Sequence, residues 1–113
     1  MATRITAAQF QDVVLQAQVP VLVDFYSDSC TPCKRLSPVL AQLEATYGDR
    51  LSVVKVNVNY DTDLAENYAV HSVPTLLLFA DGVPVQRLQG VIKQAEIEKI
   101  LEPVIQEEGG RAE

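Results

Sequence analysis

The chain has 113 residues, the usual size of one domain. Hydrophobic residues make up 48% of the sequence and charged residues 21%, which excludes an intrinsically disordered chain. Nine lysines and arginines against fifteen aspartates and glutamates give a net charge of −6. Because the basic residues are scattered, we expect neither a nucleic acid nor an anionic membrane surface as a partner.

The sequence also lacks the segments that direct a protein to a membrane or out of the cell. No stretch is apolar over the ~18 residues of a membrane span, and residues 1–10 lack the apolar core of a secretory signal. We therefore expect a cytoplasmic protein. Residues 1–106 are expected to form a single domain, and the polar residues 107–113 a frayed C-terminal tail.

The first elements alternate between strand and helix. A short strand is expected around Arg4 and Ile5. Thr6 and Gln9 have the spacing of a capping box, which predicts a helix over about Ala7–Ala17. The run Val19–Tyr26 is β-branched and apolar on both faces, as in a buried central strand.

The middle of the chain continues this alternation. A second helix is predicted, ending at Gly48, from an apolar stripe at helical spacing: Leu36, Leu40, Leu43 and Tyr47. Leu51–Asn57 follows as a strand. Asp61, with its neighbours, offers a cap for a short helix that buries Leu64 and Tyr68.

The last third predicts a hairpin and a helix. Thr75–Ala80 and Val83–Gln89 are strands, joined by the tight-turn dipeptide Asp81-Gly82. A last helix shows one apolar face, inside which Pro103 is expected to kink or weaken the final turns: Ile97, Ile100, Leu101, Val104 and Ile105. The order β-α-β-α-β-α-β-β-α predicts an α/β fold, a mixed sheet of about five strands with four helices on both faces.

The reactive residues that stand out in the sequence are Cys30 and Cys33, the chain's two cysteines. They lie where the central strand ends and the second helix begins, close enough to form a disulfide. Free N–H groups at a helix N-terminus lower the pKa of a thiol, and Pro32 suits the first turn. We therefore expect Cys30 to attack a disulfide and the less exposed Cys33 to resolve the mixed disulfide.

Two other interpretations of the cysteine pair are weaker. A zinc site needs four ligands, whereas the chain offers two cysteines and one histidine, so we expect no metal. A permanent structural disulfide would close a very small loop in a compartment that keeps thiols reduced. No other cofactor is expected.

Asp24 is the second informative residue. Strand alternation places it on one face with Leu22 and Tyr26, and both faces of this strand are covered, so burial is expected to raise its pKa. It could then accept a proton from Cys33 through a water molecule. The alternative is a carboxylate that hydrogen-bonds backbone at a strand end. Lys55, on the neighbouring strand, can pair with Asp24 and moderate the shift.

Taken together, these residues resemble the thioredoxin family from about Ile5 to Leu101. The resemblance rests on several separate matches, namely Val21–Phe25 with its aspartate, Cys30, Pro32, Cys33, Lys34, Pro38, Lys55, Val73-Pro74-Thr75, Asp81-Gly82 and Gly90. It implies a cis peptide bond between Val73 and Pro74, whose backbone pairs with an extended substrate segment beside Gly90. It further implies protein disulfides as substrates, a thioredoxin reductase-like electron donor and a monomer.

The sequence departs from the family on the substrate-facing surface. Ser29 stands where the family usually has tryptophan, and Thr31 where it usually has glycine. Gln89 replaces an apolar residue, so the docking rim is more polar. His71 is expected to be solvent-exposed, the alternative being a titrating contact with a substrate or reductase.

Three functions follow from these features. The first is a cytoplasmic thiol–disulfide oxidoreductase that reduces protein disulfides through Cys30 and Cys33. The second is a specialised protein of the same type, with a shifted redox potential and a dedicated partner or reductase, motivated by Ser29 and Thr31. The third is an interaction module of thioredoxin fold in which the cysteines are dispensable.

Overall fold

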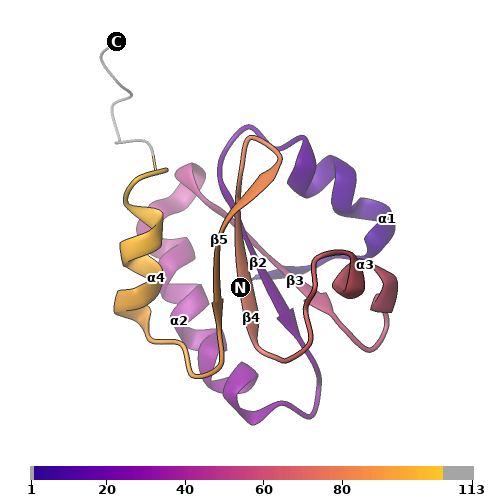
Figure 1. Cartoon of the computed structure of the whole chain (residues 1–113). Helices are drawn as coiled ribbons and strands as arrows, with labels where there is room; N and C mark the ends of the chain where they lie inside the picture. The colour runs from indigo at the N-terminus through magenta and orange to yellow at the C-terminus, as the bar shows by residue number, and fades with distance from the viewer. Residues whose placement is uncertain (1, 106–113) are drawn as a thin grey trace, which may run out of the picture.

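The structure, a computed structural model, describes residues 2–105 and shows an α/β fold around a five-stranded sheet (Figure 1). The predicted tail lies outside the described residues. The elements follow one another in the predicted order: β1 (Thr3–Arg4), α1 (Ala7–Phe10), a π-helical turn η1 (Gln11–Leu15), β2 (Val21–Tyr26), α2 (Thr31–Tyr47), a 3-10 turn η2 (Gly48–Arg50), β3 (Ser52–Asn57), α3 (Thr62–Asn67), β4 (Thr75–Ala80), β5 (Val83–Gln89) and α4 (Gln94–Leu101).

The sheet has the strand order β1-β3-β2-β4-β5, with β2 at its centre. Strands β1, β3 and β2 run parallel, whereas β4 is antiparallel to both β2 and β5. The register sets Asp24 of β2 directly opposite Lys55 of β3. The carboxyl and the lysine that the sequence singled out therefore lie on neighbouring strands at the same level of the sheet.

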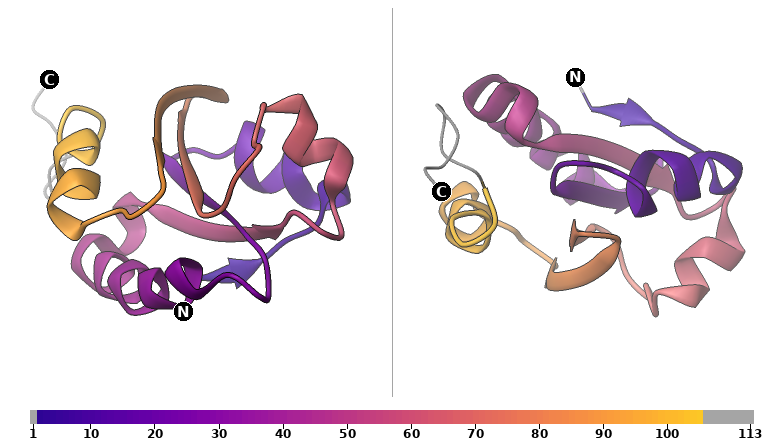
Figure 2. Two further views of the ribbon diagram at one scale, coloured as in Figure 1. Left: turned by 60° about the horizontal axis from the view of Figure 1, so that its bottom comes forward. Right: turned by 90° about the horizontal axis from the view of Figure 1, so that it is seen from above.

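Two hydrophobic cores cover the two faces of the sheet, because successive side chains of each strand point to opposite faces. On one face, α2 and α4 pack through Leu36, Leu40 and Leu43 and through Ile97 and Leu101. On the other face, α1, η1 and α3 pack against the alternate strand residues. Two further views keep α2 beside α4 at one side of the molecule and α1 beside α3 at the other (Figure 2).

Three boundaries differ from the sequence prediction. The first helix begins as the α-helical α1 and continues as the wider π-helical η1, ending at Leu15 rather than Ala17. Strand β2 begins at Val21, after Pro20. Helix α4 ends at Leu101, because Pro103 has no N–H to continue the ladder; the N–H groups of Val104 and Ile105 both donate to the Leu101 carbonyl, each at 3.0 Å.

Candidate active site

The cysteine pair forms a disulfide at the start of α2. The Cα atoms of Cys30 and Cys33 are 5.2 Å apart. Cys30 is the N-cap residue of the helix, and its Sγ accepts a hydrogen bond of 3.1 Å from the backbone N–H of Cys33. A sulfur in this position faces an N–H that has no partner within the helix, which favours the thiolate form after reduction.

Cys33 is the less exposed of the two cysteines, as the sequence predicts. Cys30 is 9% exposed and Cys33 is 4% exposed. On the exposed side, Ser29 and Thr31 flank Cys30, and both are open to solvent. Pro32 occupies the first turn of α2, where its missing N–H costs no hydrogen bond.

Asp24 lies in the middle of β2 and is 1% exposed. Neither carboxyl oxygen has a hydrogen-bond partner among the residues that the structure describes. The pKa of this carboxyl is raised from 3.8 to about 7, because burial disfavours its charged form by more than the positive charge of Lys55 favours it. The alternative of an aspartate bonded to backbone at a strand end is therefore wrong.

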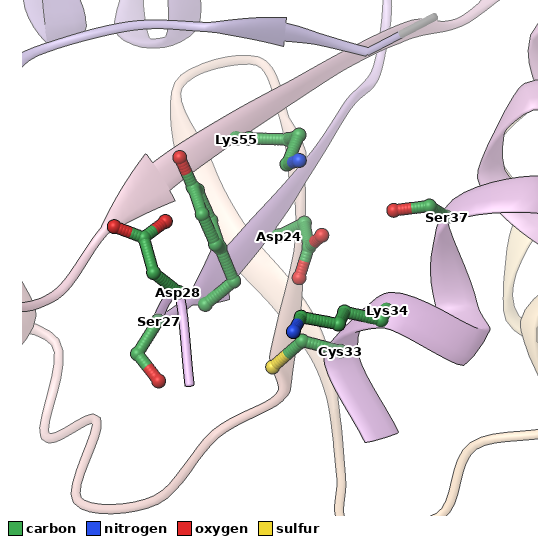
Figure 3. A pocket seen from close by; sticks show the side chains of 8 residues that line it. Asp24, Ser27, Asp28, Cys33, Lys34, Ser37 and Lys55 are labelled. Carbon is green, nitrogen blue, oxygen red and sulfur yellow. The ribbon is translucent and has the colours of Figure 1, made fainter. Parts of the chain in front are cut away.

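A small cavity of about 140 Å³ connects the carboxyl to the second cysteine. Figure 3 shows Asp24 between Lys55 of β3 and Cys33 of α2. The cavity is lined by Asp24, Tyr26, Ser27, Asp28, Cys33, Lys34, Ser37 and Lys55. The ammonium of Lys55 lies 4.3 Å from the centre of the Tyr26 ring. A group that titrates near neutral pH thus shares one cavity with Cys33.

A second hollow, of about 340 Å³, is lined in part by Ser29, the residue before Cys30. Ser29, His71 and Val73 are among its lining residues, and His71 is exposed, as expected. The peptide bond between Val73 and Pro74 is cis, which confirms the expectation from the resemblance.

Gly90 is tied to this loop by a hydrogen bond from its N–H to the carbonyl of Pro74, at 3.2 Å. The hydroxyl of Thr75 donates to the carbonyl of Ser72 at 2.7 Å and fixes the other side of the loop. The structure therefore brings Ser29 and Val73 to one hollow and joins Gly90 to the cis-proline loop.

Sequence reasoning missed three polar residues of the first cavity, Ser27, Asp28 and Ser37. Ser37 follows Cys33 by four residues, so helical spacing alone could have placed both on one face of α2. Asp28 accepts a long hydrogen bond of 3.5 Å from the side-chain amide of Asn57. Nothing in the sequence pairs these two residues, because they belong to different strand ends.

Within residues 2–105, no set of three or more histidine, cysteine, aspartate or glutamate side chains is arranged to hold a metal ion. In the same range, no helix combines the length and apolar character that crossing a membrane requires.

Comparisons with known proteins agree with this geometry. The sequence profile of the thioredoxin family matches residues 1–103. Thioredoxin 1 of Synechococcus elongatus is 35% identical over 102 residues, covering 90% of this chain and 95% of that protein. The thioredoxin of Mycobacterium tuberculosis is 39% identical over 102 residues, covering 90% and 88%. That of Mycolicibacterium smegmatis is 41% identical over 95 residues, covering 82% and 85%.

These relatives are similar over most of their own length, and the structure places a cysteine pair at the start of a helix, beside a buried carboxyl and a cis-proline loop. Such a pair exchanges disulfides by cycling between the dithiol and disulfide forms. The chain therefore belongs to the thioredoxin family and is a thiol–disulfide oxidoreductase that reduces protein disulfides.

Proposed function

We propose that Cys30 is the attacking cysteine of this oxidoreductase, Cys33 the resolving cysteine and Asp24 the group that takes up the proton of Cys33. The observation that supports the first role best is the hydrogen bond from the N–H of Cys33 to Cys30 Sγ at the N-cap of α2. A thiolate at Cys30 receives the same donor and the favourable end of the helix dipole.

The reaction starts from the dithiol form. The Cys30 thiolate attacks one sulfur of a substrate disulfide; a Cys30–substrate disulfide forms, and the other substrate sulfur leaves as a thiolate that picks up a proton. Cys33 then gives its proton to the Asp24 carboxylate, directly or across the cavity that they share, and attacks Cys30 Sγ. The second substrate thiolate leaves. The substrate gains two electrons, and the protein is left with the disulfide seen here.

Lys55 and the residues around the disulfide have subsidiary roles in this proposal. The charge of Lys55 lowers the pKa of Asp24 and so keeps part of this carboxyl ionised near neutral pH. An extended substrate segment lies on a surface around the disulfide. That surface is formed by Ser29, Thr31, Pro32, Val73, Pro74 and Gly90. Support for that surface comes from the hollow shared by Ser29 and Val73 and from the Gly90–Pro74 hydrogen bond.

We also propose a cytoplasmic monomer that is returned to the dithiol form by a reductase of the type that serves thioredoxins. The cytosol keeps thiols reduced, which suits a protein that must be re-reduced after each cycle. Of the three functions considered from the sequence, no observation favours the specialised protein or the interaction module over general disulfide reduction.

The assignment of the two cysteines is tested by trapping. A Cys33→Ser variant keeps the attacking thiol but cannot resolve, so it should accumulate covalent complexes with disulfide-containing proteins, visible on non-reducing gels and released by dithiothreitol. The matched Cys30→Ser variant should trap little. Equal trapping by both variants, or trapping by Cys30→Ser alone, would contradict the proposed roles.

A further inference from the structure

The ammonium group of Lys55 is held by an aromatic ring. Its Nζ lies 4.3 Å from the centre of the Tyr26 ring, within the ~6 Å over which a ring face attracts a cation. Tyr26 is the last residue of β2, half-buried, and lines the cavity shared by Asp24 and Cys33. The ring therefore fixes the position of the positive charge nearest to the carboxyl in the register of the sheet.

Lys55 and Asp24 do not form a hydrogen-bonded ion pair, although the sheet sets them opposite each other. Lys55 lies directly opposite Asp24 on the parallel strand, yet neither oxygen of Asp24 has a hydrogen-bond partner among residues 2–105. The ammonium is thus outside hydrogen-bonding reach of the carboxyl, although both face one cavity (Figure 3). A direct ion pair would stabilise the carboxylate and prevent it from accepting a proton near neutral pH.

We propose that Tyr26 is a positioning residue for proton transfer: its ring holds the Lys55 ammonium away from Asp24, so that the carboxyl stays able to exchange a proton with Cys33. This inference rests on the proposed role of Asp24 and adds the group that protects it. Tyr26 touches neither the substrate nor the reacting sulfurs in this account; it acts through Lys55.

Other charged and titratable groups face the same cavity and must be considered in the test. Asp28 comes from the loop after β2, and Lys34 and Cys33 come from the first turn of α2. Asp28 and Lys34 are exposed, so solvent screens their charges more than that of Lys55. Lys55 is the positive group that burial and strand register bring closest to Asp24.

The test is a titration of the Asp24 carboxyl by ¹³C NMR in the oxidised protein, in which the cysteines do not titrate. Tyr26→Leu removes the ring, lets Lys55 close on the carboxyl and should lower the pKa of Asp24 by about 1 or more. Tyr26→Phe keeps the ring face and should leave the pKa of Asp24 close to its parent value. If Tyr26→Leu does not fold, Tyr26→Thr, suited to a strand end, makes the same test.

A double-mutant cycle separates the ring's effect on Lys55 from a simple opening of the cavity to water. In the Lys55→Met background, Tyr26→Leu should leave the pKa of Asp24 unchanged, because no ammonium remains to be released. An equal fall of this pKa in both backgrounds would overturn the proposal, as would an unchanged or raised pKa in Tyr26→Leu alone. Since the titration reads Asp24 without turnover, a failure here is distinct from a failure of the cysteine-trapping experiment.

Discussion

At the scale of single residues, the buried carboxyl of Asp24 is the group that lowers the stability of the folded protein when it ionises. It is 1% exposed and has no hydrogen-bond partner in the described part of the chain, so its ionised form is poorly stabilised. Burial raises its pKa to about 7, and the nearby charge of Lys55 offsets only part of this. The raised pKa destabilises the folded protein increasingly between about pH 4 and pH 7, and it is the property on which the proposed proton transfer from Cys33 depends.

The cost of this carboxyl predicts a pH-dependent gain in stability for Asp24→Asn. Because the folded pKa is raised from 3.8 to about 7, the stabilisation from the neutral carboxyl is complete below pH 3.8 and is lost as pH rises through 7. The variant should therefore match the parent near pH 4 and exceed it increasingly up to pH 7, with an upper bound of about 4 kcal/mol.

Urea unfolding of the oxidised proteins between pH 4 and pH 8 measures this difference. The same variant should slow the resolution of mixed disulfides at neutral pH, by up to about 100-fold, because Cys33 loses its proton acceptor. A stability difference that does not vary with pH would mean that Asp24 titrates normally in the folded protein, and the proton-transfer role would then fail with it.

At the scale of elements, side chains from distant segments complete the helix ends. Asp61 stands at the N-cap of α3 but makes no cap for it; its Oδ1 accepts a hydrogen bond of 3.1 Å from the N–H of Ala7, at the start of α1. The α1 terminus also receives a local bond, from the N–H of Thr6 to the side chain of Gln9, at 2.9 Å. Helix α1 is thus capped partly from the β3–α3 connection.

Asp61→Ala removes the acceptor for Ala7 and should destabilise the protein by about 1 kcal/mol, the usual value for a lost helix cap. Asp61→Asn keeps a side-chain oxygen and should recover most of that loss, which makes it the matched control. Thermal unfolding of the two variants, followed by circular dichroism, measures the difference. If both variants lose the same stability, the charge of Asp61 rather than the hydrogen bond is responsible.

The hairpin between β4 and β5 shows how strongly a two-residue turn constrains sequence. Asp81 and Gly82 both have positive φ angles, 53° and 82°, as a tight hairpin of this type requires. A Cβ on Gly82 would lie 2.7 Å from the carbonyl oxygen of Leu15. Glycine is therefore needed both for the turn and for the close contact with η1.

At the scale of the whole molecule, three aromatic side chains join separate elements on one face of the sheet. Phe10 of α1, Tyr68 after α3 and Phe79 of β4 form a triangle with ring centres 5.4 to 5.6 Å apart. Phe79 is 1% exposed and contacts both of the other rings. This cluster packs α1 and the end of α3 against the sheet. Its three residues are distant in sequence from Cys30 and Cys33.

Phe79→Ala should lower the free energy of unfolding by about 3–5 kcal/mol, because it leaves a cavity and removes two ring contacts. The exposed Val91, which is 76% accessible, supplies a control: Val91→Ala should change stability by less than about 0.5 kcal/mol. Chemical denaturation at fixed pH with the disulfide intact measures both. A small effect for Phe79→Ala would indicate that the neighbouring side chains fill the space.

Much of the fold was predictable because the patterns are local and strong. The apolar run of β2, the leucine stripe of α2 and the Asp81-Gly82 turn each specify one element. The exact ends were less predictable: Val104 and Ile105 continue the apolar pattern of α4, yet Pro103 ends the helix at Leu101. Periodicity describes which face is buried, whereas hydrogen bonding decides where a helix stops.

The amino-acid sequence is enough to predict the reactive groups of this protein: two cysteines at the start of a helix, with a carboxyl six residues before the first of them. Tertiary structure alone decided how these groups are poised. The parallel register of β2 and β3 sets Lys55 opposite Asp24, and the Tyr26 ring holds its ammonium aside. Such contacts join residues far apart in the chain, so no local sequence pattern encodes them. The pKa of Asp24 likewise depends on its burial and on the charge of a residue from another strand.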